Sequence, residues 1–95
     1  MSNVNNFEWD DSKAVRNYIK HGVSFQEATS VFDDPFAMDD PDDQEVYGEE
    51  RFMHIGMVDN RLLTVIYTER SEKIRIISAR KATKHEQNYY RESAT

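Results

Sequence analysis

The stretch RLLTVIYTERSEKIRIISA, from Arg61 to Ala79, decides the expected fold. Its two halves, RLLTVIYTE and IRIISA, are rich in residues that favour β-strands, and the turn Ser71-Glu72-Lys73 separates them. A preceding run, Arg51 to Val58, ends at the turn Asp59-Asn60. Because short turns join consecutive strands in an antiparallel arrangement, the three runs predict an antiparallel three-strand meander.

A helix is predicted before the meander, over residues 11–20. Ala14, Val15, Tyr18 and Ile19 recur at the spacing of one apolar stripe. Gly22 can take the left-handed conformation that ends such a helix. We therefore expect the side of the helix that carries the stripe to pack on the sheet.

Two capping boxes mark the starts of further helices. Ser24 with Glu27 begins a helix that is expected to run from about residue 25 to residue 32, with its apolar side buried. Thr83 with Glu86 begins a C-terminal helix that is expected to reach about residue 92. The sequence therefore predicts two helices before the meander and one after it.

The segment Phe7-Glu8-Trp9-Asp10 alternates apolar and acidic residues, as a very short strand does. The complete order predicts the α+β class: a small antiparallel sheet, made of the three-strand meander and the short N-terminal strand, packed by two N-terminal helices and one C-terminal helix. The length of 95 residues is enough for a single domain, 1–95. Residues 1–6 are expected to be disordered.

Charge is distributed unevenly along the chain. Residues 1–32, 33–50 and 51–95 carry net charges of −1, −9 and +4, which give the chain its net charge of −6. The middle segment also contains two prolines and a glycine. We therefore expect 33–50 to be an acidic loop, in which residues 36–38 could form a short strand. The basic C-terminal half indicates an anionic partner.

Several classes of protein are excluded by composition and motif. The chain has no cysteine, so it cannot form disulfides, thiolate metal sites or a cysteine nucleophile. No apolar run approaches the roughly 20 residues of a membrane span, and the first residues do not resemble a secretory signal. We therefore expect a cytoplasmic protein with no membrane partner. The histidine spacing and the stretch DDPDDQE match no metal motif, and we expect neither a metal nor a cofactor.

Arginines on or beside the meander are the main functional signal. Arginine suits phosphate because its planar guanidinium donates two parallel hydrogen bonds and stays charged. Side chains alternate between the two faces of a strand, so Arg75 and Arg80 cannot share a face of a regular strand unless the chain bends at Ser78–Ala79. The alternative is that the arginines are solvated and paired with acids, namely Glu69, Glu72 and Glu86.

Two further positions have a functional and a structural interpretation. His54 lies in the middle of a predicted strand, where it is either a general acid or base or a half-buried strand residue. Lys20 and His21 precede Gly22 at the end of a helix, where cations complement the helix dipole. The functional alternative for this helix end is a general base or a phosphate contact.

Three stretches in this order, FEWDDSKAVRNYIKHGVSFQEATSVFDDP, ERFMHIGMVDNRLLTVIYTER and IRIISARKATKHEQNYY, resemble the BrnT family of bacterial ribonuclease toxins. The resemblance extends from Phe7 to about Tyr90. It implies a RelE-like fold, RNA cleavage and growth arrest. It also implies neutralisation by a cognate BrnA-like antitoxin of a type II pair. That antitoxin also binds DNA, so DNA would be reached only through the complex.

Without a metal motif, the expected mechanism is attack by the ribose 2′-OH on the adjacent phosphate. This chemistry needs cations on the phosphate, a base at the 2′-OH and an acid at the leaving oxygen. An aromatic side chain could stack on a base of the RNA. The candidates are, as catalytic residues, Arg75, Arg80, His54, Glu50 and Lys20, and, as RNA-binding residues, Arg51, Lys81, Lys84 and Tyr89.

Two rival interpretations belong to other classes. In one, the chain is a non-catalytic module whose cations bind the antitoxin or a nucleic acid, which would make it an inactive toxin. In the other, residues 33–50 mimic a nucleic acid and the protein acts as an acidic decoy. A neighbouring gene for a DNA-binding antitoxin would favour the toxin over both.

Overall fold

The structure is a computed structural model that describes residues 6–46 and 49–94, without the side chains of 43–46 and 94. The expected disorder of residues 1–6 therefore falls almost entirely outside the described residues. The elements are, in chain order, β1 (Phe7–Glu8), α1 (Asp11–His21), α2 (Phe25–Thr29), the 3₁₀-helix η2 (Ser30–Asp33), β2 (Met38–Val46), β3 (Glu49–Val58), β4 (Arg61–Arg70), β5 (Lys73–Lys81) and α3 (Lys84–Ala94).

The strands form one five-stranded sheet in the order β1-β5-β4-β3-β2. Strands β3, β4 and β5 correspond to the three predicted runs and pair antiparallel in sequence order. The prediction that the whole sheet is antiparallel is wrong, because β1 pairs with β5 in parallel. The helices α1 and α2 and the strands β2 to β4 lie between β1 and β5 in the chain. No tight turn joins β1 to β5, so the pair is not forced to be antiparallel.

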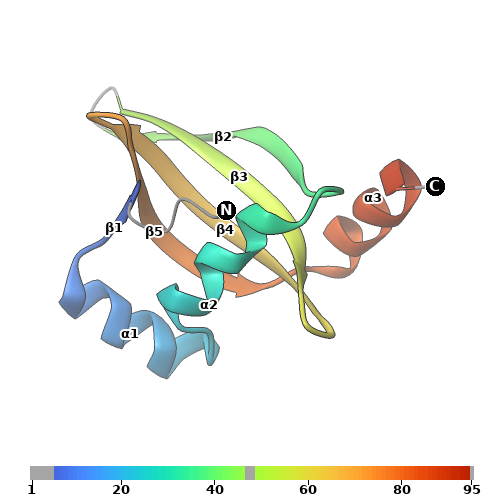
Figure 1. Cartoon of the computed structure of the whole chain (residues 1–95), viewed down its shortest axis with the longest axis horizontal. Helices are drawn as coiled ribbons and strands as arrows, with labels where there is room; N and C mark the ends of the chain where they lie inside the picture. The colour runs from blue at the N-terminus through green and yellow to red at the C-terminus, as the bar shows by residue number, and fades with distance from the viewer. Residues whose placement is uncertain (1–5, 47–48, 95) are drawn as a thin grey trace.

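The prediction of an acidic loop over residues 33–50 is also wrong. Residues 38–46 of this segment form β2, which pairs antiparallel with β3 at the edge of the sheet (Figure 1). An edge strand tolerates Pro41 and repeated aspartates, because its outer side pairs with no other strand and charges there discourage association with another sheet. The predicted short strand over residues 36–38 overlaps β2 only at Met38, the first residue of β2.

The core lies between the sheet and the N-terminal helices. It is formed by Val23, Phe25, Ala28 and Val31 from the helical segment and by Leu63, Val65, Ile76 and Ala79 from β4 and β5. We call the side of the sheet that carries these strand residues the helical face. Figure 1 shows α2 lying across this face, α1 beside β5, and α3 at one end of the sheet.

The capping box at Ser24 is confirmed, since its hydroxyl accepts from the Glu27 N–H and the Glu27 carboxylate accepts from the Ser24 N–H. The helix that follows is shorter than predicted. It ends at Thr29 and continues as η2. The tighter turn still brings Val31 into the core and leaves Phe32 partly buried against it.

The predicted orientation of α1 is wrong. Val15, Tyr18 and Ile19 of the expected stripe are 59%, 57% and 78% exposed, and only Ala14 packs against the core. The buried residue of the helix is instead Asn17. Its side chain hydrogen-bonds to the backbone of Ala79 in β5, so a polar residue determines which side of α1 faces the sheet.

Gly56 lies where η2 approaches β3 most closely. A Cβ atom there would lie 2.9 Å from Val31 Cγ1 and 3.1 Å from the Val31 carbonyl oxygen. Because the backbone of η2 cannot move away easily, Gly56→Ala is expected to lower the free energy of unfolding by about 2 kcal/mol. Urea denaturation measures the change. Met57→Ala, at the exposed neighbour, is the control, and equal stability of the two variants would contradict the prediction.

Candidate functional site

A β-bulge in β5 brings two of the predicted arginines onto one face. Ile66 pairs with Ser78 and Tyr67 pairs with Ile76, so Ile77 is an extra residue that reverses the alternation of side chains. Arg75 and Arg80 therefore point to the same side of the sheet. The sequence required a bend at Ser78–Ala79 for this arrangement, and the bulge at Ile77 serves that purpose one or two residues earlier.

Arg51 joins the same face from β3. Its neighbour Phe52 pairs with Tyr67 on the helical face, so alternation directs Arg51 to the opposite side. The Nε atom of Arg51 is buried and has no hydrogen-bond partner among the described residues. We call the side of the sheet that carries Arg51, Arg75 and Arg80 the arginine face.

Arg80 is tied to Glu86 at the start of α3. Arg80 Nη1 and Nη2 donate to Glu86 Oε1 and Oε2 at 2.8 and 3.0 Å. The hydroxyl of Thr64 and the N–H of Thr83 also donate to Oε1, both at 2.8 Å. Glu86 is only 9% exposed, and this group of donors anchors α3 on the arginine face.

These contacts shift both titrations. Burial raises the pKa of Glu86, but the hydrogen bonds from Arg80, Thr83 and Thr64 outweigh it and lower that pKa to about 2. The bond to Glu86 raises the pKa of Arg80 above its ordinary value. The alternative that the arginines pair with acids is thus correct for Arg80 with Glu86. Arg75 pairs instead with Glu8, its neighbour on β1, at 3.4 Å.

Two predicted RNA-binding residues border the arginine face from α3. Lys84 is exposed at the first residue of the helix, and the Tyr89 hydroxyl donates to Asp40 Oδ1 at 3.4 Å. Asp40 and Asp42 of β2 lie beside Met53 and Arg51 in the register, so two carboxylates share this face with the cations. The third, Lys81, is exposed at the end of β5. Phosphate and acidic groups can therefore compete for the same guanidinium groups.

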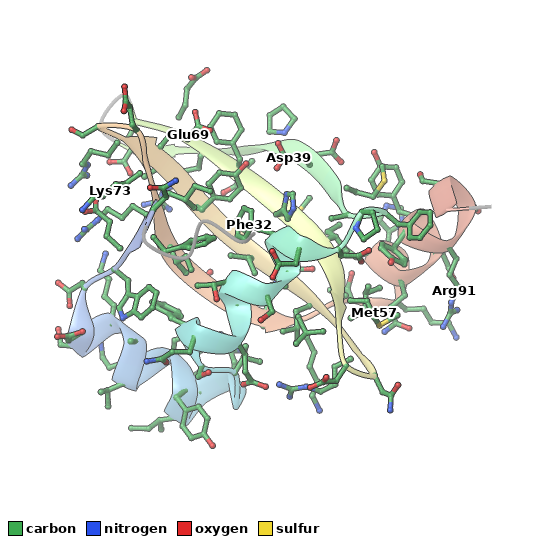
Figure 2. The ribbon with its side chains drawn as sticks, viewed as in Figure 1. Phe32, Asp39, Met57, Glu69, Lys73 and Arg91 are labelled. Carbon is green, nitrogen blue, oxygen red and sulfur yellow. The ribbon has the colours of Figure 1, made fainter. Side chains whose placement is uncertain are left out.

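His54 lies on the helical face. Its Nδ1 is 2.9 Å from Asp39 Oδ1, which also accepts from the Tyr67 hydroxyl at 2.8 Å. The imidazole stacks on the ring of Phe32 with centroids 4.3 Å apart. Phe32 and Asp39, which flank the imidazole, are labelled in Figure 2. This Asp–His pair fixes the ring, as an acid–base pair requires, but the His54 side chain is only 15% exposed.

The predicted catalytic residues are thus divided between the two sides of the sheet. Glu50 shares the face of His54 by alternation, and Lys20 is exposed on α1, which covers that face. Sequence reasoning missed Asp39 and Tyr67 as partners of His54. Their positions follow from the pairing of β2 and β4 with β3, and a segment expected to be a loop gave no signal for it.

No cluster of three or more histidine and acidic side chains is arranged to hold a metal ion within residues 6–46 and 49–94. In the same part of the chain, no helix is long and apolar enough to cross a membrane.

The chain matches the model of a known protein family. The model of the family described as ribonuclease toxin, BrnT, of type II toxin–antitoxin system matches residues 9–86. No curated protein matches the chain. The matched region covers the strands β2 to β5 and leaves out β1, and it ends within the first turn of α3 at Glu86. The resemblance inferred from the sequence is confirmed, and the chain belongs to the BrnT family of ribonuclease toxins of type II toxin–antitoxin systems.

Proposed function

We propose that the protein is an endoribonuclease that cleaves RNA on the arginine face without a metal ion. The observation that carries this proposal is the bulge at Ile77, which puts Arg75 and Arg80 on one face together with Arg51. The proposal includes a RelE-like fold and a cytoplasmic location. It also includes neutralisation by a BrnA-like antitoxin that binds DNA.

The reaction forms a bond between the ribose 2′-oxygen and phosphorus and breaks the bond between phosphorus and the 5′-oxygen. The 2′-OH loses its proton and the leaving oxygen gains one, so the products are a 2′,3′-cyclic phosphate and a 5′-hydroxyl. Negative charge increases on the phosphate oxygens in the transition state. Fixed guanidinium donors directed at those oxygens stabilise it without reorganisation.

Arg75 and Arg80 are assigned to the scissile phosphate. The pair of hydrogen bonds to Glu86 holds the Arg80 guanidinium in place, while the longer 3.4 Å contact of Arg75 with Glu8 leaves Arg75 easier to redirect toward RNA. Arg51 and Lys84 are assigned to the flanking backbone. Lys81, which pairs with Leu63 at the end of β5, points to the helical face by alternation and could contact only RNA that passes the end of the sheet. Tyr89 is assigned to stacking on a base.

The base for the 2′-OH has to lie on the face that holds the phosphate. By strand alternation and the position of α1, His54, Glu50 and Lys20 lie on the side of the sheet away from Arg75, so the proposal does not assign the proton transfer to them. Asp40 and Asp42 are carboxylates on the arginine face. We therefore assign the proton transfer to one of these two aspartates and a positioning role to His54 with Asp39.

The test is cleavage of RNA by purified protein in EDTA, with analysis of the fragment ends. Cleavage with 5′-hydroxyl ends is expected, and Arg75→Ala should slow it about 100-fold, as the loss of one transition-state donor typically does. Arg91→Ala is the control, because it removes an arginine that the proposal does not assign to the RNA. Arg91 lies in the last turn of α3 (Figure 2). Loss of cleavage in EDTA, or equal rates for both variants, would contradict the proposal.

The pairing of Arg80 with Glu86 and of Arg75 with Glu8 favours one rival function. In it, the chain is a binding module that no longer cleaves RNA, and the arginine face is part of the folded scaffold. The same experiment separates the two functions. Intact binding of the antitoxin with no cleavage by the unmodified protein would identify the module.

A further inference from the structure

The outer surface of α1 is apolar and has no partner within the described part of the chain. Six large hydrophobic side chains are exposed among the described residues, and three of them, Val15, Tyr18 and Ile19, lie on this one helix. A pocket of about 420 Å³ adjoins them, and Trp9, Ala14 and Phe25 also line it. The rings of Trp9 and Phe25, which both line this pocket, contact each other edge-to-face, with their centroids 5.9 Å apart. Exposed apolar surface that adjoins a pocket is typical of an interaction site.

Asn17 prevents α1 from burying this surface by rotation. Its side-chain Nδ2 donates to the carbonyls of Val23 and Ala79 at 3.0 and 2.8 Å, and its Oδ1 accepts from the Ala79 N–H at 3.1 Å. Turning the stripe toward the sheet would break these three buried hydrogen bonds. The apolar side of α1 is therefore held outward, where another molecule can cover it.

The charges on α1 indicate what that molecule carries. The helix holds Lys13, Arg16 and Lys20 with one acid, Asp11, whereas the whole chain has a net charge of −6. At 100° per residue, Arg16 and Lys20 lie together on the flank next to Ile19. The surface is thus an apolar stripe with a basic flank on one side, formed by Arg16 and Lys20, and with Asp11 at the pocket. It fits an amphipathic segment that carries acidic residues along one side.

We propose that the stripe Val15–Tyr18–Ile19, with its adjoining pocket, is the docking site for an apolar segment of the protein antitoxin that carries acidic residues along one side. The inference rests on the proposed function for the identity of the partner. It adds the place of contact, on the side of the sheet opposite the arginine face.

The test measures the affinity of the purified toxin for the antitoxin encoded beside it, by calorimetry. Ile19→Glu places a charge in the centre of the stripe and is expected to weaken binding at least about 30-fold, as the loss of a central hydrophobic contact does. Met57→Glu is the matched control. It makes the same change at an exposed hydrophobic residue of β3 outside α1, labelled in Figure 2.

Cleavage of RNA by Ile19→Glu is expected to equal that of the unmodified protein, because the stripe lies away from the arginine face. Failure of the proposed function would appear as absent cleavage in the unmodified protein, which leaves the affinity measurement unaffected. Equal affinities for Ile19→Glu and Met57→Glu would overturn the docking site. A dimer of this chain that Ile19→Glu converts to a monomer, with antitoxin affinity unchanged, would assign the stripe to a second copy instead.

Discussion

Replacing Glu86 by glutamine is expected to lower the free energy of unfolding at pH 7 by about 3 kcal/mol. The carboxylate accepts hydrogen bonds from Arg80, Thr64 and Thr83 and is almost buried. A neutral amide cannot accept both bonds from the guanidinium, so Arg80 would lose its partner in a half-buried position. The estimate follows from the lowering of the Glu86 pKa to about 2, since each unit is worth about 1.4 kcal/mol.

The pH dependence gives this prediction its sign. A folded-state pKa below the ordinary value of 4.5 stabilises the fold only while the carboxylate is ionised. The contribution is therefore complete above about pH 5 and is lost as the pH falls toward 2. Other carboxylates titrate in this range, among them Asp34, where hydrogen bonds from Met57 and Tyr90 outweigh burial and lower the pKa.

The measurement that isolates Glu86 is urea unfolding of the unmodified protein and Glu86→Gln at several values between pH 7 and pH 2.5. The difference between the two proteins should shrink as the pH falls below 4.5, because Glu86 is then protonated in the unfolded state and has to give up its proton on folding. Thr64→Val is the control, since it removes one donor and keeps the pair with Arg80. A difference that stays constant with pH would show that the carboxylate charge is not what stabilises α3.

Replacing Asn17 by alanine is expected to lower the free energy of unfolding by about 3 kcal/mol as well. The substitution removes three buried hydrogen bonds and leaves the N–H and C=O of Ala79 and the C=O of Val23 without these partners. Each buried polar group left unpaired costs about 1–3 kcal/mol. Because these bonds join α1 to β5, the loss should separate the helix from the sheet before the sheet itself unfolds.

Asn17→Leu distinguishes hydrogen bonding from volume, because leucine fills the site without pairing the backbone groups. A loss as large as that of Asn17→Ala is expected from urea denaturation. Val15→Ala, at an exposed position of the same helix, should change stability by less than about 0.5 kcal/mol. If Asn17→Leu were as stable as the unmodified protein, apolar packing alone would hold α1, and the account of its orientation would be wrong.

The candidate site was predictable in its residue types and only partly in its arrangement. The arginines of the meander and the border residues Lys84 and Tyr89 follow from strand and helix patterns. Whether Arg75 and Arg80 share a face depends on one extra residue, Ile77, and alternation in a regular strand separates them. The bond between His54 and Asp39 depends on an acidic segment forming an edge strand. Composition indicates a loop there, because β-strand propensity depends strongly on the neighbouring strand.

The sequence by itself determined the strands β3, β4 and β5, the capping boxes at Ser24 and Thr83, and the family. These features depend on residues within a few positions of one another, so local patterns suffice to specify them. Only the tertiary structure decided the parallel pairing of β1, the edge strand β2 and the side of α1 that faces the sheet. The physical reason is clearest at Asn17, whose partner Ala79 is 62 positions away. A buried amide that finds backbone partners at that distance outweighs an apolar stripe, and no local pattern reports the partner.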